Sequence, residues 1–94
     1  MNYYYKREWE ETTGEELTDS WGTSTYYFET NDAFHVTRQI QVFQNGNILK
    51  YDVGFIEDEF GFLTDQPLNK EHFYKFIIYE DEFIDIWNKN RKVT

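Results

Sequence analysis

Residues 38–53 read RQIQVFQNGNILKYDV and predict two alternating strands joined by a tight turn. The Asn45-Gly46 pair is the strongest short-range signal for a β-hairpin, because both residue types tolerate the positive φ angles of its turn. A two-residue loop here sets the register, and the register decides which side chains share a face. It places four apolar side chains on one face of the hairpin: Ile40, Val42, Leu49 and Tyr51.

The segments around this hairpin extend it into an antiparallel sheet. Their aromatic and β-branched content is typical of strands. Strands are predicted at five ranges: 2–10, 21–29, 33–44, 47–53 and 72–79. A three-residue loop at 30–32 pairs Phe28 with Phe34 and Tyr26 with Val36, which extends the same apolar face.

Residues 80–90 have the apolar spacing of a short amphipathic helix, with Phe83 and Trp87 on one side. Acidic residues at its start complement the helix dipole. The predicted fold class is therefore α+β. It is a four- to five-stranded antiparallel β-sheet, arranged as a meander, with one C-terminal α-helix packed on its apolar face. Residues 1–94 are expected to form one domain.

The composition restricts the classes of partner. Eighteen Asp and Glu residues against nine Lys and Arg give a formal net charge of −9. Phosphates and anionic lipid surfaces repel such a chain, so we expect neither nucleic acid nor a membrane as partner. A basic protein is the favoured partner, although an acidic surface also serves solubility alone. The chain has no cysteine and no signal-peptide pattern, and we expect a cytoplasmic protein.

Few residues are suited to catalysis. His35 and His72 lack metal-ligand spacing, and Ser20 and Ser24 do not lie in a nucleophile elbow. The acidic run at 57–59 lacks the alternating oxygen donors and turn glycine of a calcium loop. We therefore expect no enzyme activity, no metal site and no cofactor.

The connection at 54–71 is long and mixes acidic with aromatic residues. Connections of this length are usually functional or irregularly packed. Aromatic anchors inside a charged rim are typical of protein interfaces, whereas a solvated loop is the simpler interpretation of the acidic run. The candidate partner-binding residues are Glu57, Asp58, Glu59, Phe60, Phe62 and Asp65.

Arg38 falls on the same face as Ile40 and Val42. A half-buried guanidinium needs a carboxylate partner, which Glu29 or Glu8 can supply, but Arg38 can also extend to solvent at the margin of the sheet. We expect the solvent-directed arrangement.

In the predicted register Phe43 and Ile48 face the opposite, polar side. There they form an exposed patch or are covered by residues 60–68, and we favour the cover.

Several of these residues recur together elsewhere: Trp9, Glu29, Arg38, Val42, Phe43, Gly46, Phe83 and Trp87. In this order they resemble a pattern seen in small bacterial proteins that are similar to immunity proteins of polymorphic toxin systems. Such proteins bind and neutralise a co-encoded toxin. The resemblance implies a non-catalytic inhibitor whose partner is a cognate toxin, and it supplies no catalytic residue.

Two other functions are carried forward. A small-molecule or carbohydrate-binding domain could use the rings of Tyr3, Tyr5 and Tyr27, in which case a pocket should lie between them. A purely structural role is the other. The sequence does not indicate an oligomeric state.

Overall fold

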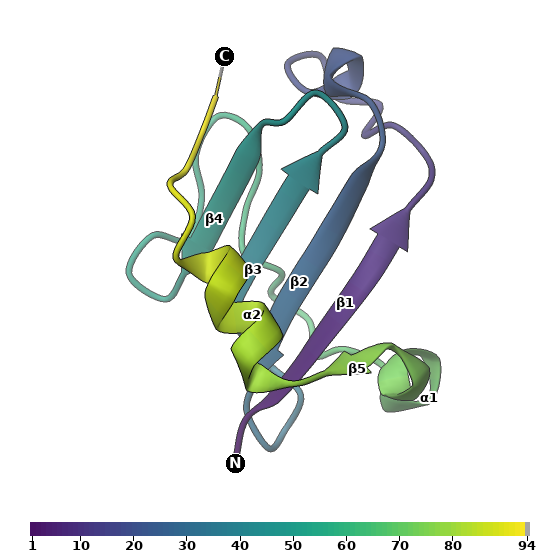
Figure 1. The fold of residues 1–94 in the computed structure, drawn as a ribbon, viewed down its shortest axis with the longest axis vertical. Coiled ribbons are helices and arrows are strands. Elements are labelled where there is room, and N and C mark those ends of the chain that lie inside the picture. Colours follow the sequence, from purple (N-terminus) through teal and green to yellow (C-terminus); the bar gives the residue numbers. More distant parts are fainter. Residues whose placement is uncertain (94) are drawn as a thin grey trace.

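Five antiparallel strands form one open sheet in the computed structural model, which describes residues 1–93 (Figure 1). Their bounds are β1 Tyr3–Trp9, β2 Ser24–Thr30, β3 Val36–Phe43, β4 Ile48–Asp52 and β5 Ile77–Ile78. The order across the sheet is β4-β3-β2-β1-β5. Strands β1 to β4 therefore form a meander, and the chain returns to add β5 to the outer edge of β1. The predicted α+β class with an antiparallel sheet is confirmed.

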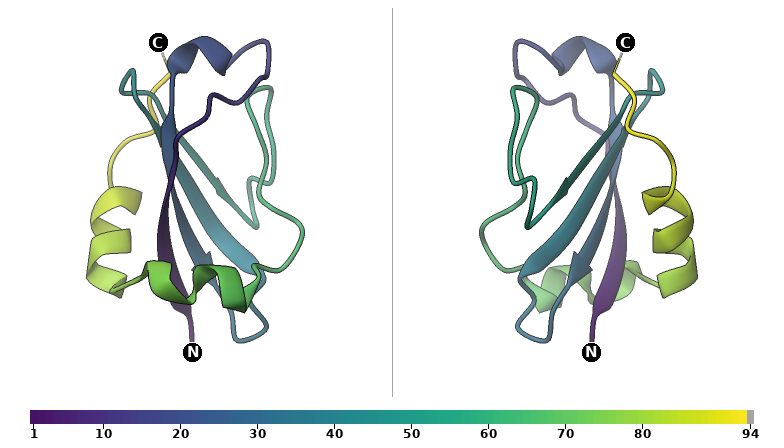
Figure 2. Two further views of the ribbon diagram at one scale, coloured as in Figure 1. Left: turned by 90° about the vertical axis from the view of Figure 1, so that its right-hand side faces the viewer. Right: turned by 90° about the vertical axis from the view of Figure 1, so that its left-hand side faces the viewer.

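Helix α2, Glu80–Trp87, packs on one face of this sheet (Figure 2). Phe83 is fully buried there and forms a cluster with Tyr4, Tyr27 and Ile40. Lys50 of β4 donates hydrogen bonds from Nζ to the carbonyl oxygens of Trp87, at 2.8 Å, and Lys89, at 2.7 Å. Trp87 is the last residue of α2 and Lys89 follows its C-cap, so a lysine of the sheet satisfies carbonyls at the C-terminal end of the helix.

The predicted strand at 72–79 is wrong over most of its length. Asn69 accepts a hydrogen bond from the Glu71 amide and caps the short helix α1, Lys70–Phe73, which a 3₁₀ turn follows. Within this range only the two residues of β5 form a strand. They pair with Tyr4 and Tyr5 of β1. None of the helices within residues 1–93 is long and apolar enough to cross a membrane.

The second face of the sheet is also covered. The connection between β4 and α1 crosses it, on the side opposite to α2 (Figure 2). This face buries a cluster whose members are Tyr5, Trp21, Phe28, Val36, Phe43, Leu49, Tyr51 and Leu63. The sheet thus carries apolar side chains on both faces, and the expectation of one apolar and one polar face is wrong.

The hairpin between β3 and β4 reverses over three residues, 44–46, and the expected two-residue loop is wrong. The Phe43 amide donates to the Asn47 carbonyl at 2.8 Å, and the Gly46 amide donates to the Phe43 carbonyl at 2.9 Å. Gly46 alone takes the positive φ angle that closes the loop, at 94°. Val42 consequently lies opposite Ile48, and Leu49 lies opposite Gln41.

This shift of one residue changes the face of every β4 side chain relative to β3. Val42 and Ile48 belong to the helix-covered face, whereas Leu49 and Tyr51 belong to the face under the connection. Phe43 also lies under the connection and is 3% exposed, so the expected cover is confirmed for Phe43 but not for Ile48.

The turn between β2 and β3 is longer than expected. Thr30 lies opposite Val36, and the Asn31 side chain accepts hydrogen bonds from the Ala33 and His35 amides within the loop. A bulge after Glu29 shifts the register once more. Phe28 lies opposite Gln39 and Tyr26 opposite Gln41, so the expected pairs of Phe28 with Phe34 and of Tyr26 with Val36 are wrong.

Candidate protein-binding groove

The connection at 54–69 is attached to the sheet by the side chain of Gln39. Gln39 Nε2 donates to the Phe62 carbonyl at 3.1 Å, and Gln39 Oε1 accepts from the Thr64 amide at 2.9 Å. Gln39 is 4% exposed, so both ends of its amide are satisfied in a buried position. The side-chain amide of Gln39 thus bonds a backbone carbonyl and a backbone amide of the connection, as a neighbouring strand would, and fixes the connection above β3.

Asp58 organises the tip of the connection from within. Its Oδ1 accepts hydrogen bonds from Tyr51 Oη at 2.7 Å, from the Phe60 amide at 2.9 Å and from the Gly61 amide at 3.2 Å. Its Oδ2 pairs with Arg91. Burial, together with the bond to Asp58, raises the pKa of Tyr51. Asp58 is therefore a structural residue, and Arg91 offsets its charge.

Phe60 and Gly61 fit the tip against the core. The Phe60 ring lies 5.2 Å from the Trp21 ring, centroid to centroid. A Cβ on Gly61 would lie 3.1 Å from Tyr51 Oη, which is closer than most Cβ atoms approach a neighbour. Phe60 therefore packs against the core of the protein and also forms part of its surface.

The loop between β1 and β2 lies next to this tip and is held by its own hydrogen bonds. The hydroxyls of Thr13 and Thr18 are 2.6 Å apart, and the Asp19 amide donates to the Glu15 carbonyl at 2.9 Å. Hydrogen bonds from Thr12 and from the Gly14 amide lower the pKa of Asp19. This network leaves the side chains of residues 15–17 at the surface.

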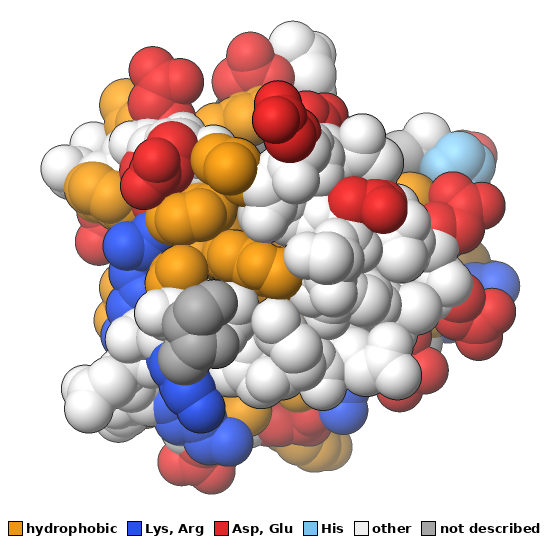
Figure 3. Space-filling model, turned by 90° about the horizontal axis from the view of Figure 1, so that it is seen from above, with side chains coloured by type: hydrophobic (Ala, Val, Ile, Leu, Met, Phe, Trp, Pro, Cys, Tyr) orange, Lys and Arg blue, Asp and Glu red, His pale blue; other side chains and the backbone are white. Residues whose placement is uncertain are grey.

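The two segments enclose a groove of about 430 Å³, called here the acidic groove. Its lining consists of Glu15, Glu16, Leu17, Thr18, Glu57, Asp58, Glu59, Phe60, Gly61 and Phe62. No lining residue is basic. Leu17 is 47% exposed and Phe62 is 59% exposed, so apolar surface lies between the carboxylates. Seen from this end of the molecule, hydrophobic side chains form a patch, with acidic side chains along one part of its rim and Lys or Arg side chains beside another part (Figure 3).

The structure brings five of the six predicted partner-binding residues into this groove: Glu57, Asp58, Glu59, Phe60 and Phe62. Asp65 is exposed and lies outside its lining. Glu15, Glu16 and Leu17 also line the groove and were not predicted. The signal was an apolar residue within an acidic loop, but nothing in the sequence places that loop beside residues 57–62.

Arg38 makes an ion pair with Glu29, so the expectation that it extends freely to solvent is wrong. Its Nε donates to Glu29 Oε1 at 2.9 Å, and a second nitrogen bonds Oε2. Thr37 donates to the same carboxylate at 2.7 Å. The guanidinium also lies over the rings of Phe83 and Trp87. The pair lies under α2, away from the groove, and joins the sheet to the helix.

The three tyrosines considered for a ligand pocket do not line one together. Tyr5 is 3% exposed and packs under the connection, whereas Tyr27 belongs to the cluster under α2. Tyr3 stacks on Phe34 at 5.6 Å. Tyr27 lies on the face of the sheet opposite to Tyr3 and Tyr5, so the three rings do not form the shared pocket that this alternative requires.

No family model, curated protein or solved structure matches the chain.

The carboxylates of the groove do not form a metal site. Within residues 1–93, no group of three or more Asp, Glu or His side chains is arranged to hold a metal ion. What the groove can bind is therefore inferred from its charge, its apolar residues and its shape.

Proposed function

We propose that this protein is a non-catalytic binding module that holds a basic protein in the acidic groove. In its most concrete form it is an immunity-type inhibitor that neutralises a basic bacterial toxin. The observation that carries the proposal is the combination of four outward carboxylates, Glu15, Glu16, Glu57 and Glu59, with exposed apolar side chains in one groove without a basic residue.

Electrostatics supports a basic partner. The chain has a formal net charge of −9, and Arg91, which lies beside the groove, is already paired with Asp58. Complementary charge accelerates encounter and selects against acidic competitors, although it contributes less to the final affinity.

The exposed apolar residues of the groove supply the affinity that complementary charge does not. Phe62 and Leu17 are exposed, and their backbones lie in segments held by the Gln39 and Thr13–Thr18 hydrogen bonds. Interface energy is concentrated in a few large side chains that are already ordered and that polar rims shield from water. A partner that covers these two residues would bury apolar surface at little cost in ordering.

The proposal places the encounter in the bacterial cytoplasm, where a co-encoded toxin is made beside its inhibitor. It rests on the resemblance to immunity proteins for the kind of partner and on the groove for the mode of binding. No step of it needs a metal, a cofactor or a catalytic residue.

The test uses the product of the adjacent gene as the partner. Binding is measured by calorimetry with wild-type protein and with Leu17→Ala and Phe62→Ala. We expect each substitution to weaken binding by about tenfold or more, because each removes a central apolar anchor. Tyr79→Ala is the control, since Tyr79 is 86% exposed but lies outside the groove, and it should leave the affinity unchanged.

A growth assay tests the inhibitor role separately. Cells that express the adjacent gene product should survive only when this protein is co-expressed, and Phe62→Ala should weaken that protection. Tight binding without protection would reject the immunity role and retain the binding module. The absence of binding by the wild-type protein would reject both for this partner.

A further inference from the structure

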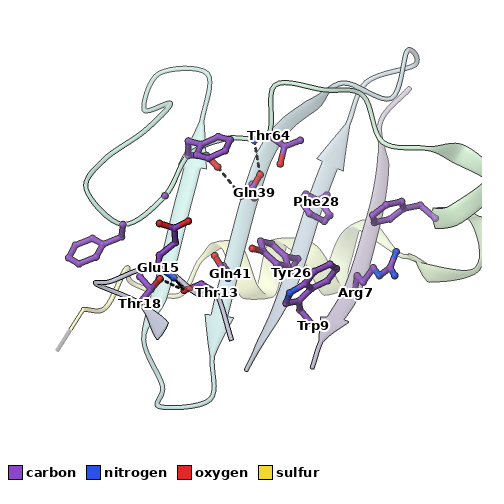
Figure 4. Close-up of a pocket in the computed structure, with 14 residues that line it drawn as sticks. Arg7, Trp9, Thr13, Glu15, Thr18, Tyr26, Phe28, Gln39, Gln41 and Thr64 are labelled. Carbon is purple, nitrogen blue, oxygen red and sulfur yellow. Dashed lines mark hydrogen bonds between the residues drawn. The ribbon is translucent and has the colours of Figure 1, made fainter. Parts of the chain in front are cut away.

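A second cavity of about 390 Å³ lies on the same side of the sheet as the connection, called here the aromatic cleft (Figure 4). Strands β1, β2 and β3 form its floor, and the connection and the β1–β2 loop form its walls. Figure 4 shows Arg7 and Trp9 at one end of the cleft, and Glu15 and Thr18 at the other. Its volume falls in the range of small-molecule sites, about 300–1,000 Å³.

Aromatic rings of the cleft are held in contact with one another. Trp9 meets Tyr26 edge-on at 6.4 Å, and Tyr26 stacks on Phe28 at 5.4 Å. Phe28 in turn meets Phe73 of α1 at 5.9 Å. Trp9 is 42% exposed and lines the cleft. Such a preformed apolar wall binds a flat or apolar group without reordering.

The amides on the floor of the cleft already have partners. Gln39 bonds the connection through both its nitrogen and its oxygen, and Gln41 Nε2 donates to Ser24 Oγ at 3.0 Å. The hydroxyls of Thr13 and Thr18 bond one another. These groups shape the cleft, but they offer few free donors to a ligand.

Arg7 differs from these groups. Within residues 1–93 its guanidinium makes neither a hydrogen bond nor an ion pair, whereas Arg38 pairs with Glu29 and Arg91 pairs with Asp58. Three rings hold it instead: Phe76 at 5.0 Å, Phe73 at 5.3 Å and Trp9 at 5.8 Å. Stacking on rings leaves the N–H groups at the guanidinium edge available, and they match the two oxygens of a carboxylate.

We propose that the aromatic cleft binds a small molecule with an aromatic or apolar body and a single carboxylate, which Arg7 receives. An arginine without a carboxylate partner is unexpected in a chain with twice as many acidic as basic residues. The same net charge of −9, together with Glu15 at the far end, disfavours ligands that carry several negative charges, such as nucleotides. The two linings share Glu15, Thr18, Phe60, Gly61 and Phe62, but Arg7, Trp9 and Tyr26 lie outside the acidic groove. Loss of the Arg7 site would therefore leave the proposed partner binding intact, and the reverse also holds.

The test titrates 3-phenylpropionate into ¹⁵N-labelled protein, with the neutral 3-phenylpropanamide as the matched ligand. We expect the acid to shift the Trp9 indole and Arg7 Nε signals and to show nuclear Overhauser effects between its ring and Tyr26. The amide should bind about tenfold more weakly, because it loses the charge-assisted bonds to Arg7. Arg7→Gln should weaken binding of the acid to a similar degree and leave binding of the amide nearly unchanged.

Lys6→Gln is the control for charge alone. Lys6 is the neighbouring residue on β1, but it contacts Glu82 of α2 on the opposite face. The Lys6→Gln substitution should leave binding of the acid unchanged. The proposal is overturned if millimolar acid causes no shift at Trp9, if acid and amide bind equally, or if Arg7→Gln and Lys6→Gln have the same effect. The comparison of the two ligands needs no variant, so it decides the question even if Arg7→Gln does not fold.

Discussion

Glu29 is the one charged residue among those described that is buried, at 5% exposure. Burial alone raises the pKa of a carboxyl group, but hydrogen bonds from Arg38 and Thr37 and the charge of Arg38 outweigh it. The pKa of Glu29 is therefore held below its ordinary value of 4.5. A carboxylate with a lowered pKa stabilises the fold above the ordinary value, and this stability is lost as the pH falls through the lowered one.

Glu29→Gln should reduce the free energy of unfolding by about 2 kcal/mol at pH 7, because it leaves the Arg38 guanidinium half-buried without its counter-charge. Urea denaturation at pH 7 and pH 3 measures the effect, and the difference from wild type should narrow at pH 3. Glu8→Gln is the control, since Glu8 is exposed on β1 and has no ion pair within residues 1–93. Equal losses in the two variants would contradict the role given to Glu29.

Neighbouring acidic residues of the connection have different roles, and their contacts separate them. Asp58 accepts three hydrogen bonds and an ion pair, whereas Glu57 and Glu59 on either side are exposed. The sequence predicts the acidic run as one unit. Only the fold, which places Tyr51 and Arg91 beside Asp58, divides it into a structural residue and two that are free to meet a partner.

The hairpin shows at the scale of the element why a strong sequence signal still led to the wrong register. Asn45-Gly46 suits both a two-residue loop and a three-residue loop closed by glycine. The alternation around it could not decide, since Phe43 and Ile48 are as apolar as Val42 and Leu49. Polar residues along one face of a strand usually mark its solvent-exposed face. Here Gln39 and Gln41 are buried by segments that are distant in sequence.

Gly46→Ala tests the three-residue loop. At a φ angle of 94° an alanine is strained, although no atom lies closer than 3.9 Å to its added Cβ. We expect a loss of about 1–2 kcal/mol in the free energy of unfolding, measured by chemical denaturation. Gly54→Ala is the matched control in the next turn. Gly54 has no positive φ angle and its Cβ would make an ordinary contact, so its substitution should change stability by less than about 0.5 kcal/mol. An unaffected Gly46→Ala would contradict the loop.

Most elements and the fold class followed from local pattern, but the second covered face did not. Strands β1 and β2 carry aromatic residues in succession, as in Tyr3–Tyr5 and Tyr26–Phe28, and strands that are apolar on both sides are typical of sheets covered twice. That signal was available. The position of the connection was not, because it depends on the bonds of Gln39 and Asp58 across the fold.

At the scale of the whole molecule the two covers of the sheet differ in character. Helix α2 closes one face through Phe83, while the connection closes the other and forms both cavities described here. The acidic groove lies at one end of that layer, and the aromatic cleft lies beside it. Their linings share five residues: Glu15, Thr18, Phe60, Gly61 and Phe62. The irregular layer is therefore the part of the molecule that carries both proposed binding sites.

The central claim is that the acidic groove receives a basic partner, and association kinetics test it most directly. The double variant Glu57→Lys with Glu59→Lys is compared with Asp65→Lys with Asp85→Lys, which makes the same change in net charge at exposed sites outside the groove. With the adjacent gene product at low ionic strength, the groove variant should associate about tenfold more slowly than the control variant, and the difference should shrink as salt is added. Equal association rates for the two variants at low salt would contradict the account.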